Sequence, residues 1–277
     1  MNWFVRLLAI VLAFWTIGGV AAESDWLEIA PGARARLVTD NVLHREGNAR
    51  AGLEVELAAG LRTYWRVPGQ AGIPATLDWS NSTGIGSLQE HWPYPRREII
   101  DGLVEYVYFD RLMVPLILEM SDETGVLSID LLMGVCSEIC VPVSATLDVP
   151  IDFDRPSRGN GLRLRQGEAA VPQMWPGAGE LFGDVWLDDA KENLLIEVGD
   201  EDFDLDGLIV DAGLDGPLFG VPQKGPIVGV IEVPLLSGLG TDAGELQDVQ
   251  LTFMSGNRPF VLHRYVQTRA GRVVAAQ

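Results

Sequence analysis

Hydrophobic and polar residues alternate on both sides of a short stretch near the middle of the chain, residues 133–142. Before this stretch the odd positions are apolar, at Leu127, Ile129, Leu131, Met133 and Val135. After it the odd positions are again apolar or small, at Val141, Val143, Ala145, Leu147 and Val149. A period of two is typical of half-buried β-strands. The pattern therefore predicts two strands whose odd-numbered side chains face a core.

The only two cysteines, Cys136 and Cys140, lie between these strands at even positions. Alternation predicts that both side chains point away from the core and face water. Four residues of extended strand span about 13 Å, whereas a disulfide requires Cα atoms within about 7 Å. A bond between the cysteines would therefore need the chain to turn back over residues 137–139, as a tight hairpin or as one helical turn. Ile139 fits a loop that needs a left-handed residue poorly, so both turns remain open.

A disulfide that closes so small a ring constrains the unfolded chain little. The loop-entropy relation gives roughly 2 kcal/mol, at the low end of the usual range for disulfides. A solvent-facing bond that stabilises weakly is better suited to exchange than to support.

The first 22 residues resemble an export signal. Arg6 precedes an apolar run over residues 7–17, and small residues lead up to Ala22, the expected end of a cleaved signal peptide over residues 1–22. The apolar run is short for a membrane span, and an uncleaved anchor is the alternative. Since no later stretch approaches 18 apolar residues, we expect no stable membrane insertion after cleavage. Export predicts a periplasmic location, where a cysteine pair normally forms a disulfide.

Further short alternating runs, separated by turn residues, extend over the rest of the chain. The composition of 31 Gly and 16 Pro, with no convincing helical period, predicts an all-β protein. The length favours two domains or one large sandwich. We predict a first domain over residues 23–155, a linker over 156–170 and a second domain over 171–277. The other candidate strands are Ala35–Val38, Gly52–Leu57, Thr63–Arg66, Val104–Phe109, Met113–Met120, Leu194–Val198, Leu208–Val210, Ile227–Val233, Val249–Phe253 and Phe260–Val266.

The negative charge of the chain argues against several classes of function. The formal net charge of −19 repels phosphate backbones and anionic lipids, so we expect no nucleic-acid partner. The acidic stretch 202–207 matches the start of a calcium loop, but Gly213 stands where that loop requires a bidentate acid. We therefore interpret the stretch as a solvated acidic loop and expect neither a metal nor a cofactor. The second domain carries no cysteine and no plausible catalytic cluster, so we interpret it as a binding or spacer module.

Several motifs of the first domain resemble those of a known family. They are Tyr64-Trp65-Arg66-Val67-Pro68-Gly69, Gly72-Ile73-Pro74, Asp78-Trp79-Ser80, Trp92-Pro93 and the stretch from Gly134 to Pro142 with its two cysteines. In this order they resemble the N-terminal periplasmic region of the DsbD/ScsB thiol:disulfide interchange family, and most closely its ScsB-like branch, which is linked to copper tolerance. Independently of that resemblance, we expect Trp65, Trp79 and Trp92 to be core residues.

The resemblance implies an immunoglobulin-like sandwich, and we extend that fold to the second domain. It also implies a redox dithiol in which Cys140 forms the mixed disulfide with partners and Cys136 resolves it. A cap loop shields the cysteine pair in the family. By position the candidates for this loop are Glu98, Ile99, Ile100 and Asp101, followed by Gly102. Tyr64 is a candidate for a supporting residue next to the pair.

The family's partners are periplasmic thioredoxin-like or disulfide-isomerase proteins, cytochrome-maturation proteins and peroxidase-like proteins. The sequence shows neither the polytopic membrane domain nor the thioredoxin-like domain of the full-length family. We therefore expect a component of a protein-disulfide reductase that receives electrons from a separate membrane donor. Glu138 disfavours a thiolate, and no Lys or Arg lies in the predicted loop, so activation would need distant groups such as His91, Arg96 or Arg97.

Three hypotheses follow from these residues. The first is a redox relay through Cys136 and Cys140. The second is a noncatalytic periplasmic binding module with a structural disulfide. The third is a copper-handling protein that uses both reduced cysteines together with Met133, since thiolate and thioether ligands suit Cu(I).

Overall fold

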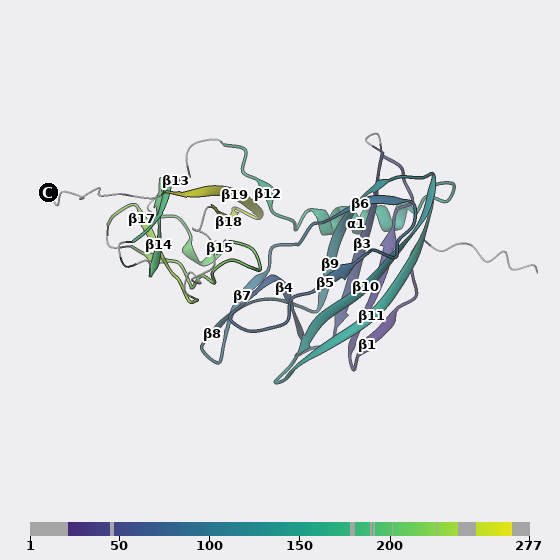
Figure 1. Ribbon diagram of the computed structural model, residues 1–277, viewed down its shortest axis with the longest axis horizontal. Helices are drawn as coiled ribbons and strands as arrows, with labels where there is room; N and C mark the ends of the chain where they lie inside the picture. The colour runs from purple at the N-terminus through teal and green to yellow at the C-terminus, as the bar shows by residue number, and fades with distance from the viewer. Residues whose placement is uncertain are drawn as a thin grey trace, which may run out of the picture.

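The computed structural model describes residues 22–44, 47–177, 181–188, 190, 192–200, 202–225, 227–237 and 248–267. The predicted signal peptide lies outside the described residues except for Ala22. Among the described residues, no helix is long and apolar enough to cross a membrane. The chain builds two groups of strands, which Figure 1 shows side by side.

The first group is a sandwich of two antiparallel sheets (Figure 1). In the described chain, the five-stranded sheet has the order β1 (Leu27–Ala30), β2 (Ala33–Thr39), β3 (Asn48–Leu57), β9 (Arg111–Met120) and β6 (Ile85–Glu90). The six-stranded sheet has the order β11 (Cys140–Asp152), β10 (Thr124–Cys136), β4 (Arg62–Gly69), β8 (Leu103–Phe109) and β7 (Arg96–Ile100), and β5 (Thr76–Asp78) pairs with β10. The all-β prediction is confirmed.

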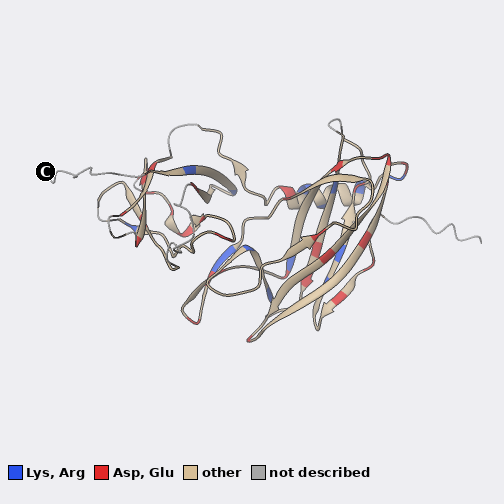
Figure 2. Ribbon diagram, in the orientation of Figure 1, with Lys and Arg blue, Asp and Glu red and all other residues tan. Residues whose placement is uncertain are grey.

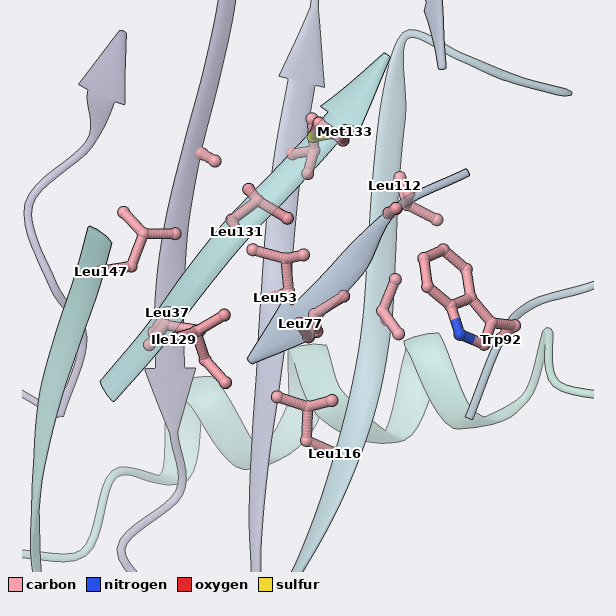
Figure 3. Packing of buried hydrophobic residues seen from close by; sticks show 14 of the residues in the cluster. Leu37, Leu53, Leu77, Trp92, Leu112, Leu116, Ile129, Leu131, Met133 and Leu147 are labelled. Atoms are coloured by element: carbon pink, nitrogen blue, oxygen red, sulfur yellow. The ribbon is translucent and has the colours of Figure 1, made fainter. Parts of the chain in front are cut away.

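The main core fills the space between these two sheets. Leu37 and Leu53 of the five-stranded sheet point toward Ile129 and Leu131 of the six-stranded sheet (Figure 3). The odd residues of β10 face this core, as the alternation predicts. Trp65 and Trp92 are buried in it, and Trp79 packs against it while partly exposed, so the expectation that these residues are core is confirmed.

The predicted linker, residues 156–170, contains a helix that the sequence pattern did not predict. Helix α1 (Arg158–Glu168) begins at Ser157, whose side chain accepts a hydrogen bond from a backbone N–H, and it contacts β2, β3 and β9 of the five-stranded sheet. Gly52 of β3 leaves room for Leu164, because a Cβ there would lie 2.8 Å from that side chain. The helix has a weak apolar period because its buried residues are Asn160, Gly161, Leu164 and Gly167.

The second group of strands follows the helix and has its own hydrophobic cluster. Its strands are β12 (Gln173–Met174), β13 (Phe182–Leu187), β14 (Asn193–Val198), β15 (Ile209–Asp211), β16 (Gln223–Lys224), β17 (Val230–Pro234), β18 (Asp248–Ser255) and β19 (Arg258–Gln267). Among the described residues they form an eight-stranded sheet in the order β15-β18-β19-β13-β14-β17-β16, with β12 on β19. We call this group the second sandwich. Its separation as a domain from residue 171 onward remains a prediction.

Every strand named in the sequence analysis overlaps an observed strand. The observed strands that were not predicted are β1, β5, β6, β7, β12, β13 and β16. Of these, β5, β12 and β16 have only two or three residues, too few for a readable period. The acidic stretch 202–207 ends in a short 3₁₀ helix, η1 (Leu205–Gly207), and the backbone N–H of Asp206 donates to the N-cap side chain of Asp204. Phe203 packs on the second cluster, so this stretch has an apolar anchor as well as its acidic residues.

Leu116 of β9 is fully buried between the two sheets of the first sandwich. We expect Leu116→Ala to lower the free energy of unfolding by about 3 kcal/mol, because it removes apolar contacts and leaves a cavity. Urea unfolding followed by tryptophan fluorescence measures this change. Leu214→Ala is the control, because Leu214 is 55% exposed, and we expect it to change stability by less than about 0.5 kcal/mol. Equal losses in the two variants would contradict this assignment of the core.

Candidate functional site

The cysteine pair lies at the end of the hairpin formed by β10 and β11. Cys136 and Cys140 are the last paired residues of the ladder, and Ser137, Glu138 and Ile139 form the loop. The two cysteines form a disulfide with an S–S distance of 2.12 Å and a Cα–Cα distance of 4.1 Å. The tight hairpin is therefore the correct one of the two predicted turns. Ile139 fits because the loop uses no positive φ angle.

The prediction that both cysteines face water is wrong for Cys136. Its side chain lies on the face of the sheet opposite the main core, as its even position requires, yet it is fully buried. A second small apolar cluster on that face encloses it, formed with Tyr64 of β4 and Val107 of β8. Cys140 packs at the edge of this cluster and stays partly exposed. An incoming thiol therefore reaches Cys140 before Cys136.

A polar network borders the exposed sulfur. The Tyr64 hydroxyl lies 3.1 Å from Cys140 Sγ and 3.1 Å from a carboxylate oxygen of Glu105, to which it donates. Arg62 donates through Nε to the same Glu105 oxygen at 3.2 Å and through Nη1 to the Ser137 carbonyl at 2.6 Å. One cation and one anion thus meet beside the loop, and the tyrosine connects the anion to the sulfur.

This network changes the expected electrostatics of the site. We expected activation from Arg96, Arg97 or His91, but the nearby cation is Arg62. Burial raises the pKa of the Tyr64 hydroxyl, against the opposing charge of Arg62. The hydroxyl therefore stays protonated at neutral pH. Its single proton is donated to Glu105 and would have to turn toward the sulfur to stabilise a thiolate on Cys140. Arg62 favours that thiolate electrostatically, whereas Glu105 disfavours it.

The sequence carried a weak signal for Arg62 and Glu105. Arg62 is two residues before Tyr64 on β4, and Glu105 is two residues before Val107, the partner of Tyr64 on β8, so both side chains lie on the outer face with Tyr64. Glu105 also interrupts the otherwise apolar and aromatic strand β8. It is only 3% exposed. An acid in such a strand indicates a buried partner, because burying a lone carboxylate is costly. Its partner could not be identified without the pairing of β4 with β8.

The segment that covers Tyr64 is the loop over residues 70–74. Gly72 lies directly on the tyrosine ring, since a Cβ at this position would be 2.3 Å from a ring carbon. Its φ angle of +107° also favours glycine. The next residue, Ile73, accepts a backbone hydrogen bond from Gly134 of β10 at 3.3 Å. The Gly72-Ile73-Pro74 motif therefore closes the outer face beside the disulfide.

Three of the candidate cap residues, Glu98, Ile99 and Ile100, lie at the end of β7, and Asp101 lies in the turn that joins β7 to β8. Glu98 pairs in register with Glu105, which places it on the same face of the sheet as the polar network, and its side chain forms an ion pair with Arg96 at 2.7 Å. Ile99 is 65% exposed, and Asp101 lies in the turn with a positive φ angle. A cap function of these residues remains a prediction.

The structure does not support Met133 as a copper ligand beside the cysteines. Met133 lies in the main core, whereas Cys136 lies in the separate cluster on the opposite face of the sheet. Among the described residues, no group of three or more His, Cys, Asp and Glu side chains could hold a metal ion.

The unequal burial of the two sulfurs predicts unequal reactivity after reduction. We expect iodoacetamide to modify Cys140 at least about tenfold faster than Cys136 in the reduced native protein, because alkylation requires an accessible thiolate. Peptide mass spectrometry after short reaction times measures both rates. In urea the two rates should converge, which serves as the control. Faster modification of Cys136 in the native protein would contradict this geometry.

Removing the tyrosine hydroxyl tests its hydrogen bond to sulfur. We expect Tyr64→Phe to slow alkylation of reduced Cys140 about tenfold at neutral pH, because a thiolate loses a charge-assisted donor. The rate of iodoacetamide reaction as a function of pH measures the effect. Glu105→Gln is the matched variant on the other side of the hydroxyl, and we expect it to accelerate the reaction because it removes a negative charge. Equal rates in all three proteins would show that this network does not act on Cys140.

Comparison with known proteins supports the family assignment. The family model described as "Thiol:disulfide interchange protein DsbD, N-terminal" matches residues 34–150, which include both cysteines. The crystal structure of the N-terminal periplasmic domain of ScsB from Proteus mirabilis has a TM-score of 0.67 to this chain at 21% sequence identity, and the match covers 89% of this chain and 98% of that one. The comparison with curated proteins found no match. At this identity the structural match shows a shared fold, and the family model shows that residues 34–150 match the N-terminal region of DsbD.

Proposed function

We propose that this protein is a periplasmic thiol:disulfide interchange protein that relays electrons through Cys136 and Cys140. The observation that supports this function best is a disulfide with one buried and one partly exposed sulfur, beside the hydroxyl of Tyr64. This asymmetry gives the two cysteines different roles. In this proposal a separate membrane protein supplies the electrons, and thioredoxin-like or disulfide-isomerase proteins of the periplasm receive them.

The proposed reaction is thiol–disulfide exchange in two steps. The thiolate of Cys140 attacks one sulfur of the partner's disulfide, so that a mixed disulfide forms and the partner's second sulfur leaves as a thiolate. Cys136 then attacks the Cys140 sulfur, closes the intramolecular disulfide and releases the reduced partner. Two electrons and, after protonation, two protons pass to the partner.

The polar network would act on the first step. In the reduced protein the Tyr64 hydroxyl would turn its proton from Glu105 to the Cys140 sulfur and so favour the thiolate, while Arg62 adds a positive charge at the neighbouring loop carbonyl. Cys136 has no such exposure, which suits a residue that reacts only within the mixed disulfide. The second sandwich is a binding or spacer module in this proposal, and links to copper tolerance or to cytochrome maturation remain open extensions of it.

One observation favours the alternative of a structural disulfide in a noncatalytic binding module. Cys136 is fully buried, and burial protects a disulfide from exchange. The two functions differ in reduction potential. A redox relay requires a potential more positive than roughly −300 mV, whereas structural disulfides lie below that value.

Trapping a partner tests the proposed function. We expect Cys136→Ser, expressed in the native compartment, to accumulate mixed disulfides through Cys140, because the resolving thiol is absent. Nonreducing electrophoresis followed by mass spectrometry identifies the trapped proteins. Cys140→Ser is the matched control and should trap little, since Cys136 is buried. The absence of any mixed disulfide in both variants, together with a potential below roughly −300 mV, would favour the structural alternative.

A further inference from the structure

Strand β4 loses its pairing immediately after the residue that contacts the disulfide. Arg62, Thr63 and Tyr64 pair with β8 in regular register, and the next pair is Gly69 with Glu105. Within the described chain, no ladder pair joins residues 65–68 to β8. The loop over residues 70–74, which covers Tyr64, follows directly. Both ends of the segment are thus paired with β8, Trp65 and Val67 pack in the main core, and the irregular part in between is held by side-chain contacts.

The second sandwich provides one of these contacts. Nη2 of Arg66, in the unpaired part of β4, donates to both carboxylate oxygens of Asp211 at 2.9 and 2.8 Å. The Asp211 side chain is only 2% exposed, and the Arg66 guanidinium also lies 4.3 Å from the centre of the Trp65 ring. Asp211 belongs to β15, more than 140 positions further along the chain. This ion pair fixes the middle of the unpaired segment from outside its own sheet.

Further contacts bind the same part of the second sandwich. The Arg97 guanidinium on β7 donates to the carbonyls of Asp206 at 2.9 Å and of Leu208 at 3.0 Å. The Tyr94 hydroxyl donates to the Gly207 carbonyl at 2.8 Å. Ile209 packs into the core of the first sandwich. The basic start of β7 lies on the side of the first sandwich that faces the second (Figure 2).

We infer that the second sandwich is a positioning element for the redox site, and that Arg66 and Asp211 are its positioning residues. By holding residues 65–68, the ion pair keeps the 70–74 loop on Tyr64 and keeps Cys136 buried. This inference deepens the proposed function and rests on it for its biological meaning. It assigns to residues 205–211 control over access of small thiols to the disulfide.

The energetics of a buried ion pair suit this role. Burial raises the pKa of Asp211, and the charge and hydrogen bond of Arg66 oppose that shift. A buried pair contributes little net stability because desolvation offsets the attraction, but loss of one partner leaves a buried charge uncompensated. The Arg66–Asp211 contact therefore fixes a geometry more than it stabilises the fold. Breaking it should release the segment locally.

The test is the rate at which dithiothreitol reduces the Cys136–Cys140 disulfide in the complete folded protein. Dithiothreitol supplies two electrons and becomes a cyclic disulfide, so no biological partner is needed. We expect Asp211→Asn to raise the rate about tenfold. Attack on the partly exposed Cys140 sulfur expels Cys136 as a thiolate, and that leaving group is hydrated only when the covering segment opens. A rate within twofold of the unsubstituted protein would overturn the inference. If Asp211→Asn does not fold, Arg66→Lys, which keeps the charge but loses the planar donor geometry, is expected to raise the rate about threefold and is judged by the same limit.

Two controls separate local release from general loss of stability. Glu56→Gln removes two ion pairs of the five-stranded sheet, with Arg34 and with Arg111, and should leave the rate unchanged. Leu116→Ala lowers global stability but leaves the Arg66–Asp211 ion pair in place. An equal acceleration in Leu116→Ala would assign the effect to global unfolding and overturn the inference. The proposed function is tested separately, because it fails if Cys136→Ser traps no partner. That result would not affect the rates of reduction by dithiothreitol.

Discussion

The period of two along β10 is the constraint on which the redox site depends. Met133 and Val135 face the main core, so Cys136 must lie on the other face of the same strand. Hairpin pairing then brings Cys140 opposite Cys136 at the last position of the ladder. The disulfide thus lies outside the main core, while the core-facing side chains of β10 and β11 hold the two strands in place. The alternation of side chains along β10 therefore gives the disulfide both a fixed position and an accessible sulfur.

An outer face has no second sheet to cover it, so the chain must cover Cys136 by other means. Tyr64 and Val107 supply the apolar contacts, and Gly72 allows the backbone to lie against the tyrosine ring. Any side chain at Gly72 would displace this cover, which explains a glycine at a positive φ angle there. The cover leaves Cys140 partly exposed. Burial of one sulfur and access to the other are therefore two results of the same packing.

The sequence was sufficient for what depends on local pattern. The hairpin strands, most other strands and the outward parity of both cysteines follow from alternation, and the family resemblance followed from motifs in a fixed order. The burial of Cys136 did not follow, because parity tells which face a side chain occupies and not what covers that face. Glu105 and Arg62 could not be joined either, since their contact depends on the pairing of β4 with β8. Helix α1 was missed because glycine and asparagine form much of its buried side.

The same limit applies to the contact between the two sandwiches. Nothing in the sequence near Arg66 points to Asp211, since the pairing joins residues 145 positions apart and requires the two groups of strands to meet. Once they meet, the irregular part of β4 gains an anchor that its own sheet does not provide. Tyr64 is only two residues from that anchor and contacts the reactive sulfur. In the proposed arrangement, a group of strands without cysteines influences thiol chemistry through the backbone of one strand, so that the second sandwich acts on the disulfide as more than a spacer.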